Sequence, residues 1–180
     1  PADQEFWREE LVGLAAAIDD QSIPDASRRA AEAVQHLRDA AGKLGQSAAM
    51  TVRNLSFCTE VSSYGVFKPF AKYEFKPGEQ AILYAEVDNF TIESTDKGYH
   101  TAMHSSYQVY DNRGAKVAEQ DYAVTEEVCR NPRRDFFIRY FVYLPKRVYD
   151  GNYTLQLTIE DTIGNKVAQS TIPFTIVGAD

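Results

Sequence analysis

The spacing of apolar residues changes near residue 48, and this change most limits the folds that the chain can adopt. Up to that point, apolar residues recur three or four positions apart, as they do on one face of a helix. From Thr51 onward, apolar and polar residues alternate, as they do along β-strands. The first helical stripe consists of Trp7, Leu11, Leu14, Ala15 and Ile18. We therefore predict a helical hairpin over residues 1–48 and a β-domain over residues 49–180.

Capping residues give the expected ends of the two helices. Asp3 is the predicted N-cap of the first helix. The segment Ser22-Ile23-Pro24-Asp25 should end that helix and begin the next, with Ser22 as N-cap, Pro24 in the first turn and Asp25 completing a capping box. The apolar face expected on the second helix consists of Ala30, Ala33, Val34, Leu37, Ala41 and Leu44.

Turn residues divide the rest of the chain into about seven or eight expected strands. Lys76-Pro77-Gly78 precedes a strand that ends near Phe90, and Asp111-Asn112-Arg113-Gly114 is typical of a β-hairpin turn. Thr162-Ile163-Gly164-Asn165 leads into the last strand, in which Pro173 cannot donate a ladder hydrogen bond. That strand should lie at an edge or contain a bulge. The pattern predicts a mainly β fold, an antiparallel β-sandwich.

Two segments carry a resemblance to a known class of domain. KPGEQAILYAEVDNF and YLPKRVYDGNYTLQLTIEDTIGNKVAQSTIPFTI resemble strand pairs of bacterial Ig-like, fibronectin-III-like β-sandwich domains of extracytoplasmic proteins. The resemblance covers the C-terminal two-thirds of the chain. It implies an Ig-like sandwich and a periplasmic or secreted location. It implies no activity, because such sandwiches serve many functions.

The segment from Phe136 to Leu144 carries large apolar side chains at both alternating sets of positions. We expect the even-numbered residues to face the other sheet. The odd-numbered residues then need a second cover, which the helical hairpin could provide with its own apolar stripe. Ile82 and Tyr84 of a neighbouring strand would share this face. The alternative is an open face that binds a partner.

Charged residues at this segment extend the possible interaction surface. Arg139 should lie at its border, and Glu86 is the expected partner of its guanidinium. Arg133 and Arg134 could bind an acidic partner, although Glu126, Glu127 and Asp135 can instead balance them. The surface predicted from the sequence therefore consists of Arg133, Arg134, Phe137, Arg139, Phe141 and Tyr143.

Composition excludes several classes of partner. The formal net charge of -7 argues against nucleic acid and anionic membranes, which attract basic surfaces. No apolar run approaches the ~20 residues of a membrane-spanning helix, so no membrane insertion is expected. Cys58 and Cys129 are either two free thiols or one disulfide. The chain opens without an initiator Met or a signal peptide, which indicates a processed form or a segment of a longer protein.

The sequence contains no recognised catalytic motif. GxSxG, GxGxxG and GxxxxGK are all absent. His100 and His104 could share one side of a strand but lack the third ligand of a zinc site, and the Asp residues at turns fit turn chemistry better than calcium binding. Tyr64, Tyr99 and Tyr149, near turns, are the tyrosines most expected to be exposed.

We therefore predict a non-catalytic interaction or accessory module with no cofactor and no metal. Its partner would be another protein or other domains of the parent chain, and its oligomeric state stays open. Three alternatives remain: a carbohydrate-binding module, a self-assembly domain acting through the N-terminal helices, and an enzyme without a recognisable motif.

Overall fold

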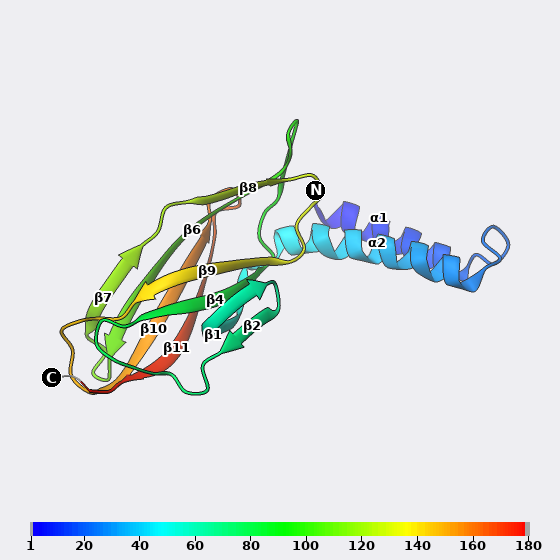
Figure 1. The fold of residues 1–180 in the computed structure, drawn as a ribbon. Helices are drawn as coiled ribbons and strands as arrows, with labels where there is room; N and C mark the ends of the chain where they lie inside the picture. Colours follow the sequence, from blue (N-terminus) through cyan, green and yellow to red (C-terminus); the bar gives the residue numbers. More distant parts are fainter. Residues whose placement is uncertain (1, 179–180) are drawn as a thin grey trace. The chain divides into compact units, whose positions relative to one another are not determined.

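The computed structural model describes residues 2–178, and side chains from residue 4 onward. It contains two helices followed by eleven strands, so the prediction of a mainly β fold with an N-terminal helical hairpin is confirmed (Figure 1). The chain divides into two compact units, one ending at Ala49 and one starting at Met50. The elements are α1 (Ala2–Ile18), α2 (Ala26–Ser47), β1 (Thr51–Ser63), β2 (Val66–Pro69), β3 (Glu74–Phe75), β4 (Gln80–Asp88), β5 (Glu93–Thr95), β6 (Gly98–Asp111), β7 (Lys116–Asp121), β8 (Thr125–Cys129), β9 (Phe136–Tyr143), β10 (Gly151–Asp161) and β11 (Lys166–Ile176).

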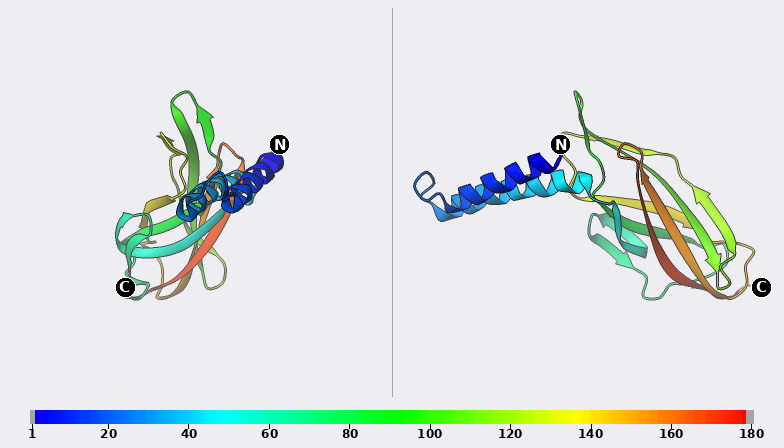
Figure 2. Two further views of the ribbon diagram at one scale, coloured as in Figure 1. Left: turned by 90° about the vertical axis from the view of Figure 1, so that its right-hand side faces the viewer. Right: turned by 180° about the vertical axis from the view of Figure 1, so that it is seen from behind.

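The first unit is a pair of helices that lie side by side and run in opposite directions (Figure 2). Small residues allow them to approach closely: Ala33 and Ala40 are buried, and a Cβ at Gly13 would lie only 3.1 Å from the Cβ of His36. The Glu9 carboxylate contacts His36 Nδ1 and accepts a hydrogen bond from Lys43 Nζ, each at 3.0 Å. Among residues 2–178, neither helix has the combination of length and apolar character needed to cross a membrane.

The N-caps differ from those expected. Helix α2 begins after Asp25, whose carboxylate accepts the N–H of Arg28 at 2.8 Å, so Asp25 is the N-cap. Ser22 instead donates its N–H to the Asp19 carboxylate and remains in the turn between the helices. Asp3 lies within α1, which begins at Ala2. The prediction of Ser22 as an N-cap was wrong because Asp25, which is nearer to the start of α2, caps that helix. The prediction of Asp3 was wrong because α1 already includes it.

The second unit consists of two sheets. One has the strand order β2-β1-β4-β9. The other has the order β3-β11-β10-β6-β5, and β7 and β8 also pair with β6. The pairs are antiparallel except the short one between β3 and β11, which is parallel. Pro173 pairs with Thr154 of β10 in an uninterrupted register, and β3 reaches only Thr175 and Ile176. Pro173 therefore lies on an open edge of β11, as its missing N–H predicts.

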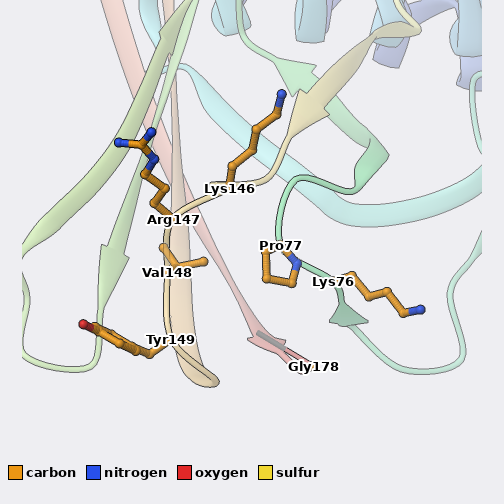
Figure 3. Close-up of a pocket in the computed structure, with 7 residues that line it drawn as sticks. All are labelled: Lys76, Pro77, Lys146, Arg147, Val148, Tyr149 and Gly178. Carbon is orange, nitrogen blue, oxygen red and sulfur yellow. The ribbon is translucent and has the colours of Figure 1, made fainter. Parts of the chain in front are cut away.

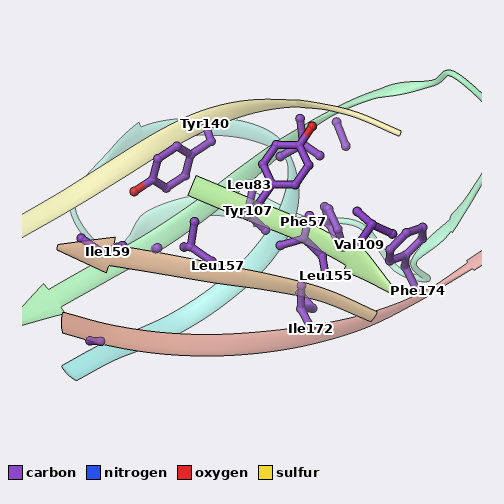
Figure 4. Close-up of a cluster of buried hydrophobic side chains, with 14 of the residues drawn as sticks. Phe57, Leu83, Tyr107, Val109, Tyr140, Leu155, Leu157, Ile159, Ile172 and Phe174 are labelled. Atoms are coloured by element: carbon purple, nitrogen blue, oxygen red, sulfur yellow. The ribbon is translucent and has the colours of Figure 1, made fainter. Parts of the chain in front are cut away.

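The main core lies between the inner faces of these two sheets (Figure 4). As the alternation predicts, four even-numbered side chains of the β9 segment are buried in it: Phe136, Tyr140, Val142 and Leu144. They meet inward-facing residues of the opposite sheet such as Leu155, Leu157 and Ile159 of β10, which are fully buried. Complete burial of one such side chain contributes about 2 kcal/mol.

Acidic residues at two turns accept hydrogen bonds from nearby backbone N–H groups. The Asp111 carboxylate accepts the N–H groups of Arg113 and Ala115. The Asp161 carboxylate is only 1% exposed and accepts the N–H groups of Thr91, Ile163 and Gly164. These contacts support turn chemistry as the reason for acidic residues at these two positions.

Both cysteines are free thiols. Cys58 is buried and Cys129 is half-buried. Burial raises the pKa of the Cys58 thiol.

Candidate functional site

The outer face of the four-stranded sheet has its own small apolar cluster. Tyr84 is fully buried there, between Phe67 at a ring-centroid distance of 4.2 Å and Phe137 at 5.6 Å. Phe67 belongs to β2, which turns back after Gly65 and pairs with β1 at the other edge of the same sheet. The expectation that Tyr84 receives the helices was therefore wrong, because Phe67 of the β1–β2 hairpin covers it, whereas Phe137 is only half-buried. Cover by the helical unit stays a prediction for the rest of this face.

Glu86 does not pair with Arg139. The buried Glu86 carboxylate accepts hydrogen bonds from the Tyr84 hydroxyl at 2.7 Å and from Asn54 Nδ2 at 2.8 Å. The guanidinium of Arg139 lies over the ring of Phe141, 5.7 Å from its centroid. The prediction of an Arg139–Glu86 pair was wrong because β1, and not β9, supplies the nitrogen donor.

The C-terminal half of β9 is the exposed part of this face. Phe141 is 49% exposed and Tyr143 is 60% exposed. They are two residues apart, so they project from the same side of the strand. Arg139, one step before them on that side, is also exposed. These three residues form one continuous polar and aromatic row, which we call the β9 row.

Strand β9 also lies at the edge of its sheet, because it pairs only with β4. The carbonyl of Phe141 accepts a hydrogen bond from the Tyr122 hydroxyl at 3.0 Å, and that of Tyr143 accepts one from the Tyr107 hydroxyl at 3.2 Å. These carbonyls therefore point away from β4. Backbone groups two residues apart point the same way, so those of Phe137 and Arg139 also face the free edge.

A groove lies along this part of the edge. Its volume is about 390 Å³. Most of its lining residues come from β8 and β9, and two come from β1. It is lined by Val61, Ser62, Thr125, Glu127, Phe136, Phe137, Ile138 and Arg139. The structure therefore brings two of the residues predicted for the interaction surface, Phe137 and Arg139, into one concave feature, the β8–β9 groove.

The two arginines in the loop before β9, Arg133 and Arg134, differ from each other in exposure and in their contacts. Arg133 forms an ion pair with Glu127 at 3.0 Å and donates a hydrogen bond to the carbonyl of Asp135 at 3.2 Å. Its guanidinium also lies over the ring of Phe136. Arg133 thus holds the loop before β9 in place and has little capacity left for a partner. Arg134 is exposed in the same loop.

A second concavity, of about 640 Å³, lies among the loops before β4 and after β9 (Figure 3). Sequence reasoning missed it, because its basic residues come from two separate turns. Its lining residues are Lys76, Pro77, Lys146, Arg147, Val148, Tyr149 and Gly178. Figure 3 shows the Lys76, Lys146 and Arg147 side chains extending away from one another, so their charges do not converge on one ligand position.

The three tyrosines that the sequence predicts to be exposed differ in their actual exposure. Tyr149 is 88% exposed, as predicted. Tyr64 and Tyr99 are half-buried, so that part of the prediction was wrong. The three do not form a flat aromatic platform of exposed rings.

The two histidines of β6 lie on the outer face of the larger sheet, each between carboxylates from neighbouring strands. His100 contacts Glu93 at 3.5 Å and Glu126 at 3.6 Å. His104 Nε2 lies 3.0 Å from Asp121, and its Nδ1 lies 3.4 Å from Glu160. The hydrogen bond to Asp121 is the main reason that the pKa of His104 is raised. Among the side chains that the structure describes, no group of three His, Cys, Asp or Glu residues could hold a metal ion.

Comparisons with known proteins identify no relative by sequence. No protein-family model matches the chain, and no curated protein matches it. Solved structures with a related arrangement include the Pseudomonas fluorescens alkylpurine DNA glycosylase AlkC, with 10% identity, a TM-score of 0.40, and coverage of 94% of this chain and 43% of that chain. The Bacillus subtilis sporulation control protein Spo0M has 10% identity, a TM-score of 0.43, and coverage of 73% of this chain and 50% of that chain.

The C-terminal domain of Wzt has 11% identity and a TM-score of 0.44, and the match covers 74% of this chain and 76% of that domain. The chain spans half or less of the length of the first two proteins. Similarities of this size carry no argument about function.

Proposed function

We propose that the protein is a non-catalytic interaction module of a larger bacterial envelope or secreted protein, related to Ig-like sandwiches, and that it binds an extended segment of a protein partner along β9. The partner segment belongs to another protein or to another domain of the parent chain. The observation that carries the proposal is the position of β9: it is an edge strand whose outward row, Arg139, Phe141 and Tyr143, is exposed.

Strand addition is the binding mode that fits this edge. An extended peptide can pair with the free backbone groups of an edge strand, while its alternate side chains enter neighbouring pockets. Tyrosine hydroxyls already occupy the carbonyls of Phe141 and Tyr143. Pairing is therefore confined to Phe137 and Arg139, beside the β8–β9 groove. A ladder this short is weak, so side-chain contacts with Phe141 have to supply much of the affinity.

The positive charge of Arg139 indicates which residues the partner segment should contain. No carboxylate among the described side chains forms an ion pair with Arg139, whereas Arg133 is already paired with Glu127. An Arg guanidinium beside an aromatic ring can bind a carboxylate and pack against an apolar side chain at the same time. We expect the bound segment to combine an Asp or Glu with a neighbouring apolar residue.

Selection from a displayed random peptide library, followed by titration of purified peptides, tests the proposal. Peptides that bind the wild-type chain should lose about 10-fold or more in affinity to Phe141→Ala, the usual size of a central aromatic contact. Tyr149→Ala is the matched control, because it removes a ring that is 88% exposed but lies in the loop after β9. Peptides that bind Phe141→Ala as well as the wild type would refute the proposed site.

One observation favours a carbohydrate-binding module as the second candidate. Phe141 and Tyr143 are two exposed rings on one side of one strand, and sugar rings stack on aromatic side chains. A glycan array separates the two functions. A retained glycan that is lost in Tyr143→Ala, together with no selected peptide, would establish the carbohydrate function in place of the peptide function.

A further inference from the structure

Each helix of the first unit carries an exposed apolar stripe. On α1 the stripe consists of Trp7, Leu11, Leu14 and Ile18, whose exposed fractions run from 58% to 81%. On α2, Val34, Leu37 and Leu44 are 42% to 43% exposed, and Ala41 lies between the last two. Successive residues in both stripes are four or three positions apart, the spacing by which helices of coiled coils and bundles meet.

The contact between α1 and α2 does not use the α1 stripe, although Leu37 of the α2 stripe borders it: its Cγ lies 3.8 Å from the position of a Cβ on Gly13. It runs through a different face, where Gly13, Ala33 and Ala40 are buried and Glu9 contacts His36 and Lys43. Small residues at this contact bury little apolar surface, and helices of this length are marginal in water without tertiary packing. The helical pair therefore leaves most of its large apolar side chains without cover from its own two helices.

The exposed surface is large enough for a stable interface. Adding Val12, which is 42% exposed, the exposed area of the large apolar side chains on the two helices is on the order of 800 Å². That is about the area that each partner contributes to a standard protein–protein interface. Scattered single apolar residues need no cover, but large apolar side chains that repeat along both helices over an area of this size indicate an interaction site.

The charges of the two helices complement each other. Between residues 4 and 18, Glu5, Glu9 and Glu10 stand against Arg8, which gives a net charge of 1 − 3 = −2. Helix α2 carries four basic residues and two acidic ones, a net charge of 4 − 2 = +2; they are Arg28, Arg29, Arg38, Lys43, Glu32 and Asp39. In a two-fold arrangement the same patch of both copies meets, so α1 of each copy can lie against α2 of the other. This arrangement brings the acidic helix against the basic one twice.

We propose that the α1–α2 hairpin pairs with the hairpin of a second copy of the chain, and that the four helices form a bundle in which the exposed apolar side chains of one copy pack against those of the other. The bundle core would then contain the leucines and Trp7, while the small-residue contact of Gly13 with α2 remains inside each hairpin. The proposed interface contains no residue of the β9 row.

Light scattering after gel filtration and sedimentation equilibrium, on the full chain in reducing buffer, test this inference. The wild type should be a dimer at micromolar concentrations. Leu14→Glu and Leu37→Glu each place a charge in the bundle core and should weaken dimerisation by about 100-fold or more. Leu14 is 58% exposed, so Leu14→Glu leaves the fold of one copy intact. Leu37 is 43% exposed and borders Gly13, so far-UV circular dichroism has to show that Leu37→Glu keeps both helices.

Ala31→Glu is the matched control, because Ala31 is exposed on α2 but lies outside the stripe. It introduces the same charge into the same helix and should leave the dimer unchanged. A wild-type chain that is monomeric up to high micromolar concentration would overturn the proposal and favour cover by another segment or protein. A dimer that survives Leu14→Glu and Leu37→Glu would also overturn it, because the stripes would then not be the interface.

Discussion

Removing the hydroxyl of Tyr84 should reveal how strongly the covered part of the outer sheet face is held together. The ring of Tyr84 is fully buried, and its hydroxyl donates to the Glu86 carboxylate at 2.7 Å while accepting the N–H of Gly65 at 2.8 Å. It thereby joins β4 to the turn that leads into β2. Burial raises the pKa of Tyr84 to about 12, so the hydroxyl keeps its proton and can donate at neutral pH.

The structure gives the expected size of the effect. A hydrogen bond to a charged group contributes about 1.5–3 kcal/mol to stability, and the Glu86 carboxylate is only 3% exposed, so water cannot easily replace the lost donor. The N–H of Gly65 is half-buried and adds less. We expect Tyr84→Phe to lower the free energy of unfolding by about 2–3 kcal/mol, or the Tm by about 8–12 °C for a unit of this size. The buried ring itself is retained, so no large cavity forms.

Urea and thermal unfolding followed by near-ultraviolet circular dichroism measure this change, since the signal reports on packed aromatic rings. Tyr143→Phe is the matched control: it removes a hydroxyl from a side chain that is 60% exposed and accepts one hydrogen bond, from Gln80 at 3.3 Å. It should change stability by less than about 0.5 kcal/mol. Equal stability of the two variants would refute the argument that the buried carboxylate depends on Tyr84.

Three further substitutions should change stability, one by raising it and two by lowering it. Gly42→Ala should raise the free energy of unfolding of the helical unit by about 0.5–1 kcal/mol, measured by thermal unfolding at 222 nm, because Gly42 lies inside α2 and an added Cβ meets no atom within 4 Å. Gly164→Ala should instead lower the Tm, because its Cβ would overlap Thr91 Oγ1; an unchanged Tm would contradict this. His104→Gln should destabilise the chain at pH 5. The pKa of His104 is higher in the folded chain than in the unfolded chain, where it is near 6.5, so protonated His104 stabilises the fold below that pH. This contribution is lost as the pH rises through the folded-state pKa. Unfolding curves at pH 5 and pH 9 should therefore differ between wild type and variant only at the lower pH.

The order of elements could be predicted because it follows from local patterns. The helical stripes and the strand alternation each lie within one element, and the turn at Asp111 to Gly114 shows the expected residues. The count of strands was too low, at seven or eight instead of eleven, because β2, β3 and β5 contain only two to four residues. Elements this short show no period that a sequence pattern can detect.

The candidate site could be predicted only in part. Alternation along Phe136 to Tyr143 correctly separated the core-facing side chains from the outward ones. It could not show that Phe67 lies over Tyr84, because that contact depends on the register of β1 with β2, which contains two shifts. The partner of Glu86 was missed for a similar reason: Asn54 adopts φ 52° beside the irregularity in the pairing of β1 with β4. Such irregular positions are set by packing between segments distant in sequence.

The outer face of the four-stranded sheet therefore divides into two parts with different physical roles. Around Tyr84, the apolar surface is covered by Phe67 of β2, and the buried Glu86 carboxylate accepts two hydrogen bonds, so this part needs no partner to be stable. Around Phe141 and Tyr143, the rings are exposed and the backbone carbonyls are held by tyrosine hydroxyls, so the strand keeps its shape without a neighbour. An edge strand that is both rigid and apolar loses little entropy when a partner binds. The covered part thus pre-organises the exposed part, which is why we place partner binding at the β9 row and the adjoining β8–β9 groove.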